Sequence, residues 1–425
     1  MAHSWNLRDP RHFRAHRITF MAGSTEVSAG KVRYDIADLS IALVSGLALA
    51  ITALFVCVAP LTGQIAGVRD FVVYWATGQQ LVHHANPYDP GAMARIEQGA
   101  GLPSGYGVLY MRNPPWGLPI AYPLGLIGVR VGTLLWSLVL LGCLWGSVQM
   151  VWQMHGRPRR LLNFLGLSFA PALMCLIVGQ TALFALLGLV LFLRLHRTRP
   201  FLAGMSLWLC ALKPHLFLVF GVVLLAWVVL TRSYRVVLGA AAAFAASLAV
   251  TWWIDPTAWA DYAQMMRTVG IENESIPCWS VALRLWITPQ ATGIQYVLPV
   301  LGCGWALAYF WKRRDGWDWA RDGGLLVVVS LFVAPYCWLF DQAIAIPALL
   351  RAAYFTPSRV LLSILAAASV VIEVALALGV NLPSAFFLWT APGWLAWYVL
   401  AACRKGETPD SEIKERAQEP MAVRF

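Results

Sequence analysis

Apolar runs alternate with short polar connections along most of this chain. A transmembrane helix needs about 20 apolar residues, and the hydropathy pattern gives about twelve segments near this length. They fall at about 38–60, 130–152, 161–178, 180–196, 200–212, 214–231, 234–253, 289–311, 323–339, 340–353, 358–379 and 384–403. The pattern therefore predicts an all-α polytopic membrane protein with about twelve transmembrane helices.

Basic residues gather in every second connection between these segments. The basic connections are 155–160, 194–199, 231–235 and 312–321, and the polar stretch after residue 403 is also basic at its start. Because cytoplasmic loops collect Lys and Arg, we expect both termini to lie in the cytoplasm. The opposite side then carries two long outer loops, 61–129 and 255–288.

The chain is predicted to form one membrane domain, residues 38–403, between a basic cytoplasmic segment, 1–37, and a cytoplasmic tail, 404–425. The first outer loop is too apolar for a free linker. Its residues Phe71 to Val82 have the spacing of an amphipathic helix. We therefore expect interfacial helices in this loop, lying on the membrane face.

Composition agrees with a membrane protein and excludes other classes. Hydrophobic residues make up 59% of the chain and charged residues 12%, and the mean hydropathy is +0.64. Such a chain is neither a soluble enzyme, a secreted disulfide scaffold nor a disordered protein. The net charge of +11 reflects basic cytoplasmic loops, so no nucleic-acid partner is expected.

Sequence motifs of several common enzyme classes are missing. There is no phosphate-binding glycine loop, no zinc-protease helix motif and no nucleophile elbow. The cysteines have no zinc-like spacing. We therefore expect no cofactor and no metal site, and any chemistry must come from polar residues at the outer membrane boundary.

Asp70 is the first candidate catalytic residue. It lies about ten residues beyond the first apolar segment, at the expected start of the interfacial helix. A carboxylate is favoured there by the helix dipole alone. Equally, a carboxylate in a partly dehydrated site can act as a general base toward an acceptor hydroxyl.

Two cations are candidate phosphate contacts. Lys213 lies between two apolar segments, where an ionisable side chain is costly and usually has a function. The competing interpretation is that its ammonium group reaches the lipid headgroups. Arg112, in a proline-rich stretch, can bind a phosphate through two hydrogen bonds or simply pack in its loop. Either cation would stabilise the charge of a leaving phosphate.

Other polar residues at the same boundary are candidates for substrate binding, with loop packing or helix capping as the alternative. Short segments, 200–212 and 340–353, flank Lys213 and Asp341, and half-length helices usually line an internal cavity. The candidates for substrate binding are Tyr74, Tyr88, Asn113, Gln180, Asn273 and Asp341.

The order of these motifs resembles a known family. R-D-F-V-V-Y-W-A-x-G, N-P-Y-D-P, R-N-P-P-W-G-L-P, V-G-Q-T-A-L, A-L-K-P-H, N-E-S and A-P-Y-C-W-L-F-D-Q follow one another over about residues 40 to 400. This series resembles glycosyltransferase family 87, the membrane-embedded C-type glycosyltransferases.

The resemblance implies an enzyme that uses a polyprenyl-phosphate sugar donor at the outer face of the bacterial cytoplasmic membrane. It implies transfer of a mannose-like hexose or a pentose to a glycan or glycolipid acceptor, without nucleotide or metal. By similarity, Asp70 matches the catalytic base and Lys213 the donor-phosphate contact. The family's late motif often has His where this chain has Phe340 and Asp341, which leaves the acceptor open.

Two other functions fit the same composition. A transporter or flippase of lipid-linked saccharides also has many spans and broken helices, although the charges here gather at one face rather than at the midplane. An inactive membrane scaffold is the third interpretation. The sequence favours the enzyme, in which Asp70 deprotonates an acceptor hydroxyl that displaces the polyprenyl phosphate from the anomeric carbon with inversion.

Overall fold

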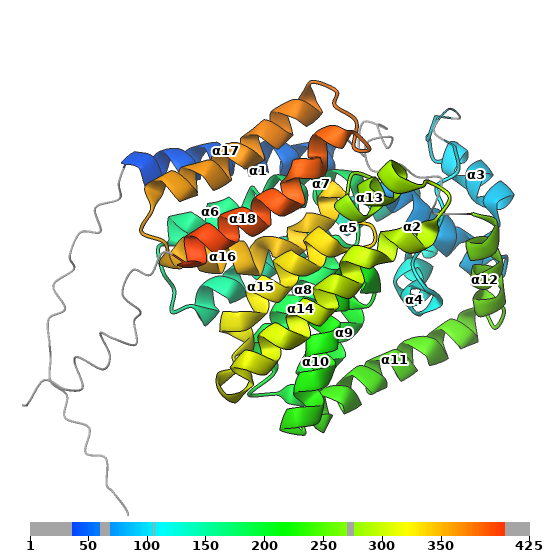
Figure 1. Cartoon of the computed structure of the whole chain (residues 1–425). Helices are drawn as coiled ribbons and strands as arrows, with labels where there is room; N and C mark the ends of the chain where they lie inside the picture. Colours follow the sequence, from blue (N-terminus) through cyan, green and yellow to red (C-terminus); the bar gives the residue numbers. More distant parts are fainter. Residues whose placement is uncertain (1–35, 60–68, 104, 106, 270–275, 404–425) are drawn as a thin grey trace, which may run out of the picture. The chain divides into compact units, whose positions relative to one another are not determined.

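The computed structural model describes residues 36–59, 69–103, 105, 107–269 and 276–403, and these residues form helices and connecting turns without any β-strand. Residues from Ile36 onward belong to one unit (Figure 1). The predicted cytoplasmic segment 1–37 and tail 404–425 lie almost entirely outside the described residues. The all-α prediction is confirmed for the part that is described.

Seven helices in the described part are long and apolar enough to cross a membrane, or eight if one bent pair counts as a single span. About twelve spans, as predicted from hydropathy, are therefore not found. The seven are Leu39–Val58 in α1 (Ile36–Val58), α5 (Val129–Met154), Pro214–Thr231 with α10 (Leu218–Thr231), α11 (Tyr234–Ile254), Thr292–Gly316 with α14 (Val297–Arg313), α17 (Arg359–Ala377) and Ala385–Ala402 with α18 (Thr390–Cys403).

The other predicted segments form shorter helices. α8 (Ala182–Leu195) has 14 residues and α15 (Trp319–Val333) has 15, so each is shorter than the hydrocarbon core of about 30 Å at 1.5 Å per residue. The remaining short helices are α9 (Pro200–Cys210) and α16 (Ile346–Phe355). Most residues of α8, α15 and α16 are buried. Their apolar character therefore reflects contact with other helices of the protein.

The bent pair joins η5 and α6 (Arg160–Leu167) to α7 (Ala170–Val178), with an angle of 50° between them. The break falls at Ser168 and Phe169, and Pro171 is the second residue of α7, within its first turn. Proline is well tolerated at this position because its missing N–H would have no helical partner there. The α7 half of this pair leads directly into the site described below.

The first outer loop contains α2 (Arg69–Val82), α3 (Pro90–Gly99), η3 (Pro115–Gly117), α4 (Leu118–Ala121) and η4 (Tyr122–Leu126). Helix α2 is present as predicted, but Phe71, Val72 and Leu81 are buried within the protein. The helix packs against η4 and α5, so its apolar face is covered by protein rather than by lipid.

A close backbone contact fixes α2 against η4. A Cβ atom on Gly78 would lie 2.3 Å from the carbonyl oxygen of Ala121, and one on Gly125 would lie 2.1 Å from the carbonyl oxygen of Gly78. Only glycine permits this approach at both positions. Gln79 adds a hydrogen bond from Nε2 to the Gly125 carbonyl at 2.7 Å. Because α2 carries Asp70, this contact sets the position of the carboxylate.

The second outer region contains α12 (Ala258–Thr268) and α13 (Trp279–Ile287). After α15 the chain turns through η10 (Leu339–Ala345) into α16. The described side chains of η10 are buried, and η10 packs against α7, α8 and α15. Figure 1 shows α8 and α15 near the middle of the helical unit and α12 at its edge.

Candidate active site

A cavity of about 370 Å³ is formed by the first outer loop together with the turns before α8, before α10 and around η10. Six of the residues predicted to carry function line it, and they come from segments far apart in the chain. These six are Asp70, Tyr74, Arg112, Asn113, Gln180 and Lys213. The folding of the chain therefore brings most of the predicted polar residues to one place.

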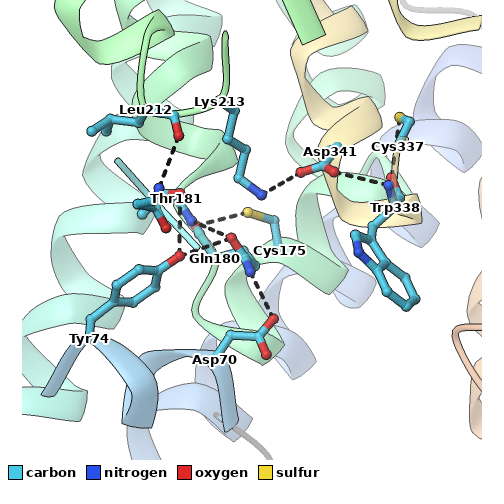
Figure 2. Close-up of polar contacts among 11 residues, drawn as sticks. Asp70, Tyr74, Cys175, Gln180, Thr181, Leu212, Lys213, Cys337, Trp338 and Asp341 are labelled. Carbon is cyan, nitrogen blue, oxygen red and sulfur yellow. Dashed lines mark hydrogen bonds and ion pairs between the residues drawn. The ribbon is translucent and has the colours of Figure 1, made fainter. Parts of the chain in front are cut away.

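Asp70 lies in the first turn of α2 and receives a hydrogen bond from Gln180. The Nε2 atom of Gln180 lies 3.1 Å from Oδ2 of Asp70 (Figure 2). The carbonyl oxygen of the same amide accepts from the Tyr74 hydroxyl at 3.1 Å and from the backbone N–H of Thr181 at 3.1 Å. Because two donors face Oε1, the amide NH₂ must face Asp70.

Tyr74 acts as a hydrogen-bond donor in this network. Its ring is buried and packs on Trp136, with ring centroids 5.3 Å apart. Burial raises the pKa of Tyr74, and the nearby Asp70 carboxylate raises it further. The hydroxyl therefore stays protonated and holds the Gln180 amide in the orientation that serves Asp70.

The turn that carries Gln180 is fixed by its backbone. Gly179 ends α7 with φ of 77°, a left-handed conformation that favours glycine. The carbonyl of Gly179 accepts the indole N–H of Trp136 at 2.8 Å. The backbone N–H groups of Gly179 and Gln180 both donate to the carbonyl of Cys175 at 3.0 Å. Gln180 is thus held at the end of α7 before substrate arrives.

Lys213 forms an ion pair with Asp341 at the other side of this network. Its Nζ atom lies 2.6 Å from Oδ1 of Asp341, and Oδ2 of Asp341 accepts the backbone N–H of Trp338 at 3.0 Å. Lys213 is 8% exposed and Asp341 0%. Lys213 lines the cavity, whereas Asp341 does not. Asp341 therefore holds Lys213 in place from behind the cavity wall.

One wall of the cavity is the extended segment 108–114, which is tied to two other elements. The Nδ2 atom of Asn113 donates to the carbonyl of Leu212 at 3.0 Å, so this side chain braces the turn that carries Lys213. On the far side, Oε2 of Glu97 accepts the backbone N–H of Leu109 at 3.1 Å. Arg112 lies on this wall and lines the cavity.

Besides Asp341, one described substrate-binding candidate does not line the cavity. Tyr88 is buried and does not line it, and its ring meets Tyr262 edge-on at 5.4 Å. Tyr262 does line the cavity, so Tyr88 supports a wall instead of forming one. Asn273 lies outside the described residues.

Sequence reasoning did not single out several aromatic residues at the cavity. His215 and Tyr336 stack with ring centroids 3.7 Å apart, and both line the cavity together with Trp338. Each lies within four residues of Lys213 or inside the A-P-Y-C-W-L-F-D-Q motif. Their place in these motifs could have identified them as candidate ligand contacts, because aromatic faces suit sugar rings and apolar chains.

The arrangement combines a proton acceptor, cations and aromatic faces in one cavity. Asp70 can accept a proton, and Lys213 and Arg112 can contact an anion. Across the described ranges, no group of three or more His, Cys, Asp or Glu side chains is placed to hold a metal ion.

Comparison with known proteins gives one match. The model of glycosyltransferase family 87 matches residues 110–340, which is more than half of the chain. The matched region includes Arg112, Gln180 and Lys213. No curated protein and no solved structure matches the chain.

Proposed function

Because the chain belongs to glycosyltransferase family 87, we propose that it moves a mannose-like hexose or a pentose from a polyprenyl-phosphate donor to a hydroxyl of a glycan or glycolipid. The proposed site of transfer is the cavity at the outer face of the cytoplasmic membrane. The proposal rests on one observation: the Asp70 carboxylate accepts a hydrogen bond from Gln180 and lines the same cavity as Lys213 and Arg112.

The reaction is a single displacement at the anomeric carbon. Asp70 takes the proton of the acceptor hydroxyl, whose oxygen forms the new bond to the anomeric carbon. The bond between that carbon and the phosphate oxygen breaks, and the phosphate leaves with the bonding electrons. The configuration inverts because the acceptor attacks from the side opposite the phosphate. Polyprenyl phosphate departs as an anion, so no acid is needed to protonate it.

Lys213 and Arg112 stabilise the charge that develops on the departing phosphate. Lys213 is already held by Asp341, so it needs no reorganisation during the reaction. Asp341 also neutralises part of the Lys213 charge, and Arg112 is the second cation that lines the cavity. The aromatic pair of His215 and Tyr336 offers an apolar face to the sugar or to the first prenyl unit.

The direct test is sugar transfer in membranes that contain Asp70→Asn, measured with a panel of radiolabelled polyprenyl-phosphate sugars. Loss of the general base should lower the transfer rate by about 10²–10⁴-fold. Asp89→Asn is the matched control, because Asp89 caps α3 by accepting the N–H of Ala92 and asparagine caps equally well. Asp70→Asn protein that is folded and transfers at the wild-type rate would refute the assignment.

Gln180 is proposed as a positioning residue for Asp70. In Gln180→Leu the carboxylate loses a donor that favours its charged form. We therefore expect transfer to fall by about tenfold or more and the acid limb of the pH–rate profile to move to higher pH. Gln153→Leu, which removes an exposed hydrogen bond from Arg194 outside the cavity, should leave that limb where it is. An unshifted limb in Gln180→Leu would contradict the positioning role.

A further inference from the structure

A second cavity, of about 470 Å³, lies at the other end of the helices that lead from the candidate active site. Helix α8 starts directly after Thr181 and ends at Leu195, next to this cavity. Helices α10 and α15 likewise connect the two regions, and α15 packs against both α8 and α10. Figure 1 shows α8 and α15 near the middle of the helical unit and α10 toward its lower edge.

The second cavity collects positive charge from two of the basic connections predicted to face the cytoplasm. Arg197 follows α8, and Arg232 and Arg235 lie in the turn between α10 and α11. Arg197 is paired with Asp318. No salt bridge of Arg232 or Arg235 is present among the residues that the structure describes. No acidic residue belongs to the described lining.

The wall of this cavity is partly aromatic. Trp317 and Trp319 line it, and the indole N–H of each is shielded from solvent, so these residues contribute ring surface. The arginines of the lining donate hydrogen bonds through their side chains and cannot accept them. The site therefore presents cationic donors beside an aromatic wall, and such donors are the complement of a phosphate group.

The surface beside the cavity is apolar. Val229 is 66% exposed and Leu230 50%, near the end of α10, and Tyr234 is exposed at the start of α11. Exposed aliphatic side chains on a spanning helix contact acyl chains, and aromatic residues are enriched at the membrane interface. A ligand that fills this site therefore meets cations at its head and an apolar surface at its tail.

We propose that this cavity binds the phosphate headgroup of an anionic phospholipid through Arg232 and Arg235, beside the tryptophan wall. Basic pockets between transmembrane helices are suited to such headgroups. A net negative lipid is preferred over a zwitterionic one because the described lining has arginines and no acidic side chain, and the neighbouring Asp318 is already paired with Arg197. The proposal does not depend on the proposed transfer reaction, since the two cavities lie at opposite ends of α8.

The test measures lipid binding to the purified full chain in detergent by native mass spectrometry. Phosphatidylglycerol, phosphatidylethanolamine and inorganic phosphate are titrated separately. We expect phosphatidylglycerol to bind at least about tenfold more tightly than phosphatidylethanolamine, and Arg232→Gln with Arg235→Gln to remove that preference. The control pair is Arg199→Gln with Lys312→Gln, which removes the same charge from exposed residues outside the cavity lining and should keep it.

Wild-type elution and melting temperature in lipid-free detergent establish that each variant is folded. If the arginine pair fails this requirement, Ser233→Glu places a carboxylate between the two arginines and should weaken phosphatidylglycerol binding. An unchanged lipid preference in the folded arginine or glutamate variant would overturn the proposal. Inorganic phosphate that competes with phosphatidylglycerol at equal concentration would overturn the assignment to a lipid, because it would show a site for a free anion.

Discussion

Lys213 and Asp341, 128 positions apart in the chain, form a buried ion pair with 2.6 Å between Nζ and Oδ1. Two charges removed from water are tolerated only when they compensate each other and their other hydrogen bonds are made. Here the second carboxylate oxygen of Asp341 receives the N–H of Trp338, and the Lys213 ammonium also lies 5.1 Å from the centre of the Phe340 ring. The pair joins the turn before α10 to η10 and so closes one side of the cavity.

Removing one partner of this ion pair should destabilise the protein more than removing both partners. Lys213→Met leaves the Asp341 carboxylate buried without its cation, and we expect a loss of about 3–5 kcal/mol in the free energy of unfolding. Asp341→Asn leaves the cation and should have a similar effect. The double variant leaves no buried charge and should therefore lose less than either single variant. Denaturant titration in mixed detergent micelles measures all four proteins, and simple additivity would show that the pair contributes no coupling.

The role of Asp341 illustrates what the sequence could and could not predict at the site. A charge at a short connection between apolar segments marked both Asp341 and Lys213 as candidates, and Lys213 lines the cavity whereas Asp341 does not. The pairing itself was not predictable, because nothing local in the sequence relates the turn before α10 to η10. Asp341 is therefore a partner of a cavity residue, where the sequence suggested a direct substrate contact.

The contact between α2 and η4 gives a second prediction. In Gly78→Ala the new methyl group would meet the Ala121 carbonyl at 2.3 Å, so α2 must move and carry Asp70 with it. We expect about 1–3 kcal/mol of destabilisation and a loss of transfer activity that exceeds the loss of folded protein. Transfer per folded molecule, normalised by the monodisperse elution peak, is the measurement.

Gly142→Ala is the matched control, since a Cβ atom there meets nothing within 4 Å and the site lies in the middle of α5. This variant should be neutral or slightly stabilising because alanine favours helix. Equal activity of the two variants per folded molecule would mean that the position of α2 does not control the reaction.

Glu97 predicts a pH dependence of stability. Burial raises the pKa of Glu97 to about 7, although the hydrogen bond from the Leu109 N–H opposes the shift. A carboxyl whose pKa is higher in the folded state disfavours folding once it can ionise. The protein should therefore keep its full stability below the ordinary carboxyl pKa of about 4.5 and lose stability as the pH rises from there through about 7, by at most about 3 kcal/mol.

Glu97→Gln isolates this effect, because glutamine keeps an oxygen for the Leu109 N–H and does not ionise. The free energy of unfolding of wild type minus that of Glu97→Gln should fall between pH 5 and pH 8. A difference that stays constant over this interval would show that the carboxyl does not titrate there. Leu109 belongs to the cavity wall that carries Arg112. Transfer activity measured over the same pH range therefore shows whether ionisation of Glu97 disturbs this wall.

The helices were predicted from hydropathy with mixed success. The segments at 234–253 and 358–379 agree closely with α11 and α17. Both helices are apolar over a full span, and most of each is not buried in protein. The segments at 180–196 and 323–339 are equally apolar, yet α8 and α15 are short helices covered by other helices. Hydropathy cannot separate these cases, since burial in protein and burial in lipid select the same side chains.

The length of α8 has a consequence for where the reaction would occur. The helix has 14 residues and is therefore about 21 Å long, whereas the hydrocarbon layer is about 30 Å thick. A helix of this length does not reach from one surface of a bilayer to the other. At least one end of α8 is therefore sunk below the surface, or the bilayer thins around the protein. A donor anchored by its prenyl tail would then reach the Asp70 cavity with little displacement out of its own leaflet.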